Sequence, residues 1–180
     1  MIAVAFRKIR FGEDSMLRKK SREVKEIDEK IVQLLDDMNE TMVRANGIGL
    51  ASPQIGILKR VIIVDVGEGL IELINPEIIE ESGVQNGQEG CLSIPRKVGY
   101  VDRPEFIKVV GLNRHGESVT YEATGLLSTV FCHEIDHLNG VLFTDRCSEL
   151  YEIEEDDEGQ IDYEYGSQDE ESNFLDIKRN

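Results

Sequence analysis

Apolar residues recur at helical spacing in two segments of the chain. In residues 28–44 five of them fall on one face of a helix: Ile31, Leu34, Leu35, Met38 and Met42. In residues 125–139 six do so: Leu126, Leu127, Val130, Phe131, Ile135 and Leu138. This spacing predicts two helices, each with an apolar face. The second is predicted to be buried, so that its polar residues need partners.

Between these helices, short segments rich in Val and Ile predict β-strands. We expect strands at residues 60–66, 70–75, 106–112 and 119–123, the last two joined by a turn at residues 113–117. Strands and helices in this order predict an α+β fold, with antiparallel or mixed sheets packed around the helix of residues 125–139.

The charge of the chain is concentrated at its C-terminal end. The 180 residues carry a formal net charge of −16. Up to Cys147 there are 18 basic and 23 acidic residues, whereas from Ser148 onward there are 2 and 13. We therefore predict one catalytic domain over residues 1–147 and an acidic tail over residues 148–180, mobile or loosely docked because like charges repel.

Composition also narrows the functional classes. A sequence pI near 4.6 argues against direct binding of nucleic acid. No stretch approaches the roughly 18 consecutive apolar residues of a membrane span, and the N-terminus has no apolar signal-peptide region. We expect no contact with a membrane and a cytoplasmic location, where the three cysteines stay reduced.

The candidate chemistry lies in the second predicted helix, at His133-Glu134-Ile135-Asp136-His137. Two imidazoles four residues apart lie one helical turn apart on the same face, where both can bind one metal ion. Glu134 is placed beside such an ion, as a proton carrier for a water molecule that the ion activates. The alternative is that these polar residues only satisfy one another inside a core.

A catalytic metal site normally has a third protein ligand. The residues that follow His137 offer none, unlike those of zinc endopeptidases with the same motif. Upstream, the polar turn Glu89-Gly90-Cys91-Leu92-Ser93 presents a cysteine, which makes Cys91 the better candidate. Cys132 precedes His133 but is rotated about 100° from it on a helix, so we interpret it as a buried core residue.

Three motifs in this order resemble those of the peptide deformylase family. They are GIGLASPQ at residues 47–54, EGCLS at residues 89–93 and HEIDH at residues 133–137, and the resemblance extends from about residue 3 to about residue 146. It implies an enzyme that removes the N-formyl group from the initiator methionine of nascent proteins. It further implies three metal ligands, Cys91, His133 and His137, with Glu134 as the acid/base and Gln54 with the Leu92 backbone N–H as stabilisers of the oxyanion.

The resemblance also implies how the substrate is held. The methionine side chain would enter an apolar pocket beside the metal, with the peptide backbone pairing near Gly49. The implied contact residues are Ile48, Gly49, Leu126, Thr129 and Val130. The family is associated with Fe²⁺, for which Zn²⁺, Ni²⁺ or Co²⁺ can substitute, because thiolate and imidazole ligands suit all four. Some members dock on the ribosome through a basic C-terminal helix, and the acidic tail makes that doubtful here.

Two alternative functions and the hydrogen-bond partner of Asp136 stay open at this point. A zinc endopeptidase would cleave internal peptide bonds, and a non-catalytic metal-binding or redox-sensing protein would bind metal without releasing formate. Asp136 is a candidate partner for the N–H of a metal-bound histidine, or for a nearby arginine. In the family Glu89 pairs with an arginine, for which Arg103 is the candidate here.

Overall fold

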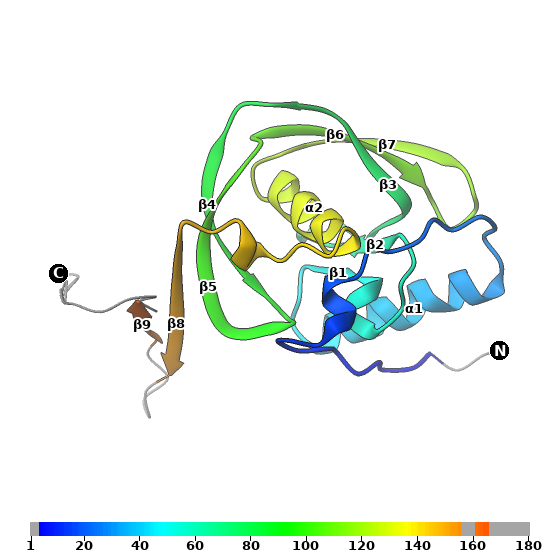
Figure 1. Ribbon diagram of the computed structural model, residues 1–180. Helices are drawn as coiled ribbons and strands as arrows, with labels where there is room; N and C mark the ends of the chain where they lie inside the picture. Colours follow the sequence, from blue (N-terminus) through cyan, green and yellow to red (C-terminus); the bar gives the residue numbers. More distant parts are fainter. Residues whose placement is uncertain (1–3, 156–160, 166–180) are drawn as a thin grey trace.

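The computed structural model describes residues 4–155 and 161–165, and it has two antiparallel sheets around one helix (Figure 1). The first sheet contains β1 (Gly49–Ala51), β2 (Val61–Val64), β3 (Ile71–Ser82), β6 (Phe106–Leu112) and β7 (Ser118–Thr124), in the order β1-β2-β3-β6-β7. The second contains β4 (Gln85–Cys91), β5 (Ile94–Arg103), β8 (Glu149–Glu155) and β9 (Ile161–Tyr165), in the order β4-β5-β8-β9. Three short 3₁₀ helices complete the described elements: η1 (Ser15–Arg18), η2 (Ser52–Ile55) and η3 (Phe143–Asp145).

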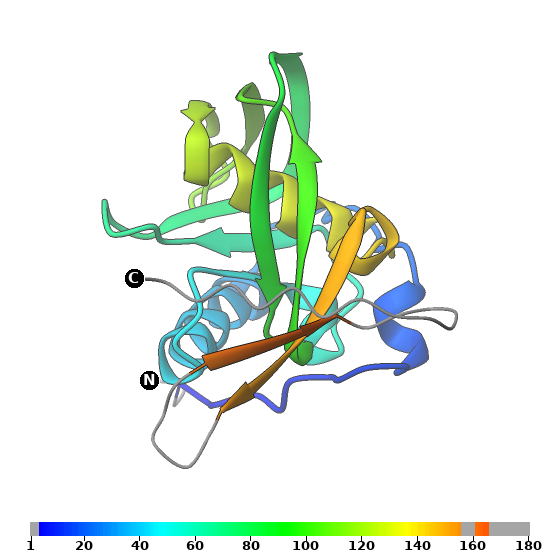
Figure 2. The ribbon, with the colours of Figure 1, turned by 90° about the vertical axis from the view of Figure 1, so that its left-hand side faces the viewer.

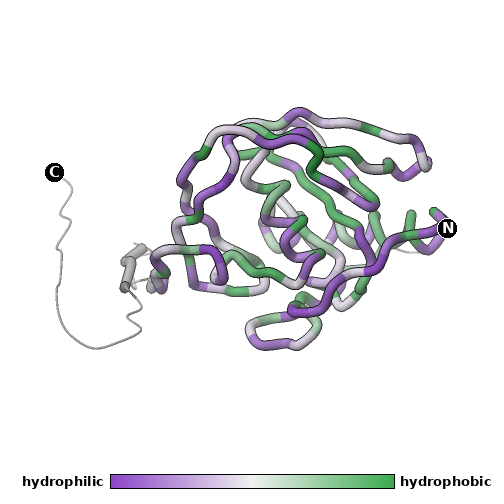
Figure 3. Tube along the Cα trace, turned by 45° about the horizontal axis from the view of Figure 1, so that its top comes forward, coloured by the Kyte–Doolittle hydropathy of each residue, from purple (hydrophilic) through white to green (hydrophobic). Residues whose placement is uncertain are grey.

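Helix α2 (Gly125–Leu138) runs through the middle of the molecule and contacts strands of both sheets (Figures 1 and 3). Its apolar side chains form one core with β2, β3, β6 and β7. Ten of its residues are buried, including all five of the 133–137 motif. The motif is therefore held inside the fold, where each polar group requires a partner.

Strand β2 is buried on both faces, and its side chains alternate between two cores. Ile62 and Val64 belong to the core beneath α2, whereas Val61 and Ile63 belong to the core beneath α1 (Glu29–Arg44). This double burial explains why an antiparallel strand reads as an uninterrupted apolar run.

Helix α1 covers the first sheet with its predicted apolar face. Asp28 caps its N-terminus by accepting hydrogen bonds from the backbone N–H groups of Lys30 and Ile31. At its C-terminus Asn46 has a φ of 53°, and the Gly47 N–H donates to the Met42 carbonyl at 2.9 Å. This left-handed turn ends the helix and directs the chain into β1.

The predicted helices and strands are confirmed; β6 has the predicted bounds, and the others differ at one or both ends. The strand predicted over residues 70–75 continues to Ser82 in β3. Strands β4 and β5 were not predicted, because their residues are mostly polar or exposed. Only the polar turn at residues 89–93, where the two strands meet, was expected. None of the described helices is long and apolar enough to cross a membrane.

The first residues of the predicted acidic tail form β8, which pairs with β5 from Glu149 to Glu152. These residues are part of the second sheet. Residues 156–160 and 166–180 lie outside the described part of the chain. The division of the chain at residue 147 therefore stays a prediction.

Candidate metal centre and cavity

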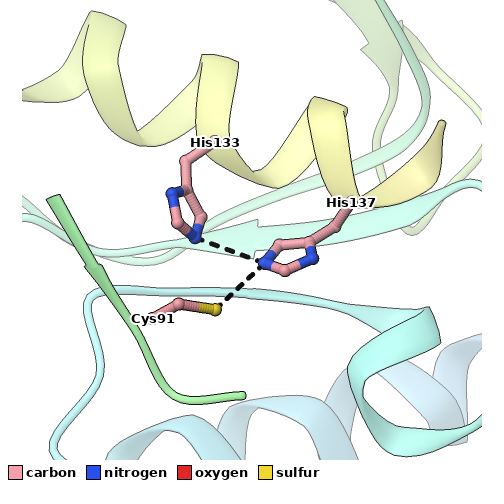
Figure 4. A group of neighbouring side chains, drawn as sticks. All are labelled: Cys91, His133 and His137. Atoms are coloured by element: carbon pink, nitrogen blue, oxygen red, sulfur yellow. Dashed lines mark hydrogen bonds between the residues drawn. The ribbon is translucent and has the colours of Figure 1, made fainter. Parts of the chain in front are cut away.

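Cys91, His133 and His137 lie together, although they come from two elements (Figure 4). Cys91 ends β4, and the two histidines lie one turn apart on α2. The Cys91 Sγ is 3.3 Å from the His137 Nε2, which is 3.2 Å from the His133 Nε2. All three ligand atoms lie within 4.8 Å of one another.

These distances fit one tetrahedral cation. With metal–nitrogen bonds of about 2.0–2.1 Å and a metal–sulfur bond of about 2.3 Å, tetrahedral angles place the nitrogens roughly 3.3 Å apart and each nitrogen roughly 3.5 Å from the sulfur. Both imidazoles present Nε2 to the cluster, and one thiol completes it. A soft thiolate with two imidazoles is a donor set for Zn²⁺, Fe²⁺, Co²⁺ or Ni²⁺.

The orientation of His133 is set from the second sheet. Its Nδ1 lies 2.8 Å from the Glu89 Oε2, and Glu89 accepts two hydrogen bonds from the Arg103 guanidinium, at 2.7 and 3.0 Å. Asp136 accepts from Arg103 at 2.6 Å and from Arg146 at 2.6 and 2.8 Å. Glu89 is therefore the carboxylate that positions a ring, whereas Asp136 pairs with arginines.

The two rings differ in their electrostatics. Burial lowers the pKa of His133, but hydrogen bonds to Cys91 and Glu89 outweigh burial and raise that pKa well above its ordinary value. Burial and the neighbouring His133 lower the pKa of His137 well below its ordinary value. The lowered pKa of His137 favours the neutral imidazole, the form that binds a metal. Its Nδ1 is buried and has no hydrogen-bond partner among the described residues.

Glu134 lies beside the cluster and is 3% exposed. Its Oε2 is buried and has no hydrogen-bond partner among the described residues. Burial raises the pKa of Glu134 to about 7, which His133 opposes and Glu89 reinforces. Gly49 makes room for this carboxylate, because a Cβ at position 49 would collide with the Glu134 side chain and lie 2.8 Å from the Val130 Cγ1.

The Gln54 amide points at the same cluster. Its Oε1 accepts a hydrogen bond from the Ala51 N–H at 2.7 Å. Its Nε2 is then directed to the Cys91 Sγ at 3.6 Å and the Ser93 Oγ at 3.2 Å. Because the carbonyl is already held, the NH₂ group of Gln54 is the one offered to the site.

One cavity of about 390 Å³ opens beside the cluster. All the predicted catalytic and substrate-contacting residues line it: Ile48, Gly49, Gln54, Leu92, Leu126, Thr129, Val130 and Glu134. Cys91 and His133 also line it. Sequence reasoning missed two residues. Ser93 of the EGCLS motif accepts a hydrogen bond from the Gln54 NH₂ group, and Ile153, which lies among acidic residues with no signal for a site, lines the cavity.

Cys132 is not part of the cluster, as predicted. It is 6% exposed and packs in the core between α2 and the first sheet. Burial raises the pKa of its thiol to about 11, which keeps it protonated and unreactive at neutral pH.

The chain matches known proteins over most of its length. Residues 6–152 match the family model of polypeptide deformylase. A peptide deformylase from Alkaliphilus metalliredigens is 61% identical over 143 residues, which are 79% of this chain and 97% of that protein.

Solved structures agree with this match. A peptide deformylase from Thermotoga maritima superposes with a TM-score of 0.78 at 43% identity, over 80% of this chain and 99% of that one. A peptide deformylase from Acinetobacter baumannii, solved with Met-Ala-Ser bound, gives 0.76 at 34% identity, over 80% and 99%. The chain therefore belongs to the polypeptide deformylase family, hydrolases that remove the N-formyl group from newly made polypeptides.

Proposed function

We propose that this chain hydrolyses the N-formyl group of formyl-methionyl peptides at the cavity beside Cys91, His133 and His137. These three residues hold the metal ion, and Glu134 moves the proton. The observation that carries the proposal is the convergence of one thiol and two Nε2 atoms beside the buried Glu134 carboxylate, whose Oε2 has no hydrogen-bond partner among the described residues.

The metal supplies Lewis acidity. A divalent cation at such a site polarises a carbonyl oxygen and makes a water molecule more acidic. The donor set accepts Fe²⁺, Zn²⁺, Ni²⁺ or Co²⁺, and we assign Fe²⁺ as the native ion because the resemblance to the family implies it. Glu89 holds the His133 ring so that its Nε2 faces Cys91.

Glu134 is the general base and then the general acid. It takes a proton from the water that attacks the formyl carbon, and it gives that proton to the nitrogen as the carbon–nitrogen bond breaks. The products are formate and a peptide with a free amino group. Two observations support this role: Glu134 lines the cavity, and its carboxylate lies against Gly49.

Gln54 and the Leu92 backbone N–H stabilise the oxyanion that forms during the attack. The Gln54 NH₂ group is preorganised, because the Ala51 N–H fixes the other end of the amide. A donor that is already in place is worth about 10²–10³ in rate at such sites.

The cavity wall supports methionine at the first position. Ile48, Leu126, Thr129 and Val130 line it beside the His133 ring, and they offer a mostly apolar surface. The Acinetobacter baumannii relative was solved with Met-Ala-Ser, a peptide that starts with methionine as a deformylated product does. Gly49 in β1 allows the substrate backbone to pair there as an added strand.

Formate release from formyl-Met peptides tests the function directly. The protein is purified anaerobically, its metal content is measured by elemental analysis, and the wild type is compared with Glu134→Ala. We expect both proteins to hold about one metal ion per chain, and turnover to fall by at least about 10²-fold in the variant. Metal binding without formate release from the wild type would favour a sensing role, and cleavage of internal bonds would favour an endopeptidase.

The cellular setting follows from the substrate. Nascent formylated polypeptides are made in the bacterial cytoplasm, so we propose that the protein acts there. The net charge of −16 disfavours docking on ribosomal RNA through the tail.

A further inference from the structure

Strand β8 lies against β5 as a fitted part of the second sheet (Figures 1 and 2). The Ser148 N–H donates to the Tyr100 carbonyl at 3.1 Å, and the Tyr100 and Tyr151 rings meet edge to face at 6.1 Å. Gly99 permits this approach, since a Cβ there would lie 2.8 Å from the Cys147 Cβ. Strand β5 is therefore shaped to receive the chain that leads into β8.

The pairing brings one residue of β8 to the catalytic cavity. Lys97 is opposite Glu152, and their side chains form an ion pair at 3.1 Å. The next residue, Ile153, is half-buried and lines the same cavity as Cys91 and Glu134. It is an apolar side chain in a strongly acidic segment, and its position in the cavity wall distinguishes it from its exposed neighbour Glu152.

The order of the strands places Ile153 away from the reacting atoms. Cys91 ends β4, and β8 is two strands further along the sheet. Two spacings of about 4.8 Å put β8 on the order of 10 Å from β4. An extended peptide advances about 3.3 Å per residue, so a peptide that runs from Cys91 toward β8 would cover this distance in about three residues.

Alternation of side chains leads to the same residue. In an extended peptide the first and third side chains point to one side and the second to the other. If the methionine side chain enters the cavity, the third side chain faces the cavity as well. We propose that Ile153 forms an apolar subsite for the third residue of the formyl-methionyl substrate, which makes β8 a determinant of substrate preference. This inference rests on the proposed function.

The test uses the full-length protein and three substrates: formyl-Met-Ala, formyl-Met-Ala-Gly and formyl-Met-Ala-Leu. We expect the wild type to prefer Leu over Gly at the third position about five- to tenfold in kcat/KM, the effect of one partly buried aliphatic side chain. Ile153→Ala should reduce this preference to less than about twofold through KM, with kcat and the activity on formyl-Met-Ala unchanged. Ile153→Val should keep most of the preference.

A matched control separates a subsite from a general loss of an isoleucine. Ile79 is 53% exposed on β3 and does not line the cavity, so Ile79→Ala should leave all three substrates unaffected. The proposal is overturned if Ile153→Ala keeps the wild-type preference. It is also overturned if the activity of this variant on formyl-Met-Ala falls as much as its activity on formyl-Met-Ala-Leu. Where Ile153→Ala does not fold, Ile153→Phe replaces it, and an unchanged preference there overturns the proposal too. A wild type that releases no formate from any substrate refutes the proposed function instead.

Discussion

Glu89 and His133 are 44 positions apart and joined by one hydrogen bond, with 2.8 Å between the Glu89 Oε2 and the His133 Nδ1. Glu89 belongs to β4 and His133 to α2, so this contact ties the two sides of the candidate metal site together. Arg103, 4% exposed, holds the same carboxylate with two further hydrogen bonds. The direction of the His133 Nε2 therefore depends on a residue that is not itself a proposed ligand.

Replacing Glu89 by Gln tests this dependence. The amide keeps the shape but removes the negative charge, and an NH₂ group in place of Oε2 removes the acceptor that Arg103 and His133 share. We expect metal affinity to fall about 10–100-fold, the usual cost of losing such a partner. Competition with a chromophoric chelator measures the change. Glu122→Gln is the control, because Glu122 pairs with Lys108 on the surface; equal affinities in the wild type and Glu89→Gln would contradict the assigned role.

Gly49 separates β1 from the Glu134 carboxylate. A methyl group at this position would collide with Glu134 and with Val130, so Gly49→Ala must displace one of them. We expect kcat to fall by at least about tenfold and stability by about 1–3 kcal/mol, the range for overpacking. Gly87→Ala is the matched control, since nothing lies within 4 Å of a Cβ there. Formate release and thermal unfolding are measured for both variants. Equal kcat values in the wild type and Gly49→Ala would show that the close approach of Gly49 and Glu134 is unimportant for catalysis.

The parts of the fold that were predicted from the sequence are those with a strong hydrophobic period. Helix α1 has its five apolar residues on one buried face, and β2 is an uninterrupted apolar run. Strands β4 and β5 have no such signal, because Gly87, Gly90 and many exposed polar residues interrupt the alternation. Their pairing depends on the partner strand and on the turn at Leu92, which single-strand patterns do not reveal.

The same limit applies to the candidate site. Cys91, His133 and His137 were predicted because their residue types and spacing carry the chemistry. Asp136 was left open as the partner of a metal-bound histidine or of an arginine, and it pairs with Arg103 and Arg146. The partner of His133 is Glu89, which comes close only through the packing of β4 against α2. Ile153 carried no signal for a site, because a few apolar residues in an acidic segment, here Leu150, Tyr151 and Ile153, indicate at most that the segment docks loosely.

Asp37 makes stability depend on pH. Its side chain is 1% exposed, and it accepts hydrogen bonds from the Ala5 N–H at 2.8 Å, from Gln33 at 2.9 Å and from Arg7 at 2.6 and 2.8 Å. Burial alone would raise the pKa of this carboxyl, but these hydrogen bonds outweigh burial and lower its pKa below 3.8. The stabilisation is thus fully present above about pH 4 and is lost as the pH falls through the lowered value.

Asp37→Asn should therefore reduce the free energy of unfolding by about 1.5–3 kcal/mol at pH 7, because the hydrogen bonds to a charged group are weakened. The difference from the wild type should shrink as the pH falls below 3.8, the ordinary pKa of an aspartate. Urea unfolding at several pH values measures it. Asp36→Asn on the same helix is the control, since Asp36 is 36% exposed and its pair with Arg114 should contribute less than about 1 kcal/mol. A difference that is constant down to pH 2 would contradict the linkage.

Two truncations test where the catalytic unit ends. A chain that ends at Glu155 keeps β8, whereas a chain that ends at Cys147 removes it and exposes the edge of β5, including the Tyr100 ring that packs on Tyr151. All three proposed metal ligands and Glu134 lie upstream of residue 138, so both chains should bind metal and hydrolyse formyl-Met-Ala. We expect the first to match the full-length protein in stability and kinetics.

The second should unfold several degrees lower, because an uncovered strand edge and lost apolar contacts destabilise the second sheet. Thermal unfolding with formate release distinguishes these cases: impairment of both chains would place essential contacts beyond Glu155, and a fully stable chain ending at Cys147 would show that β8 contributes nothing to the fold.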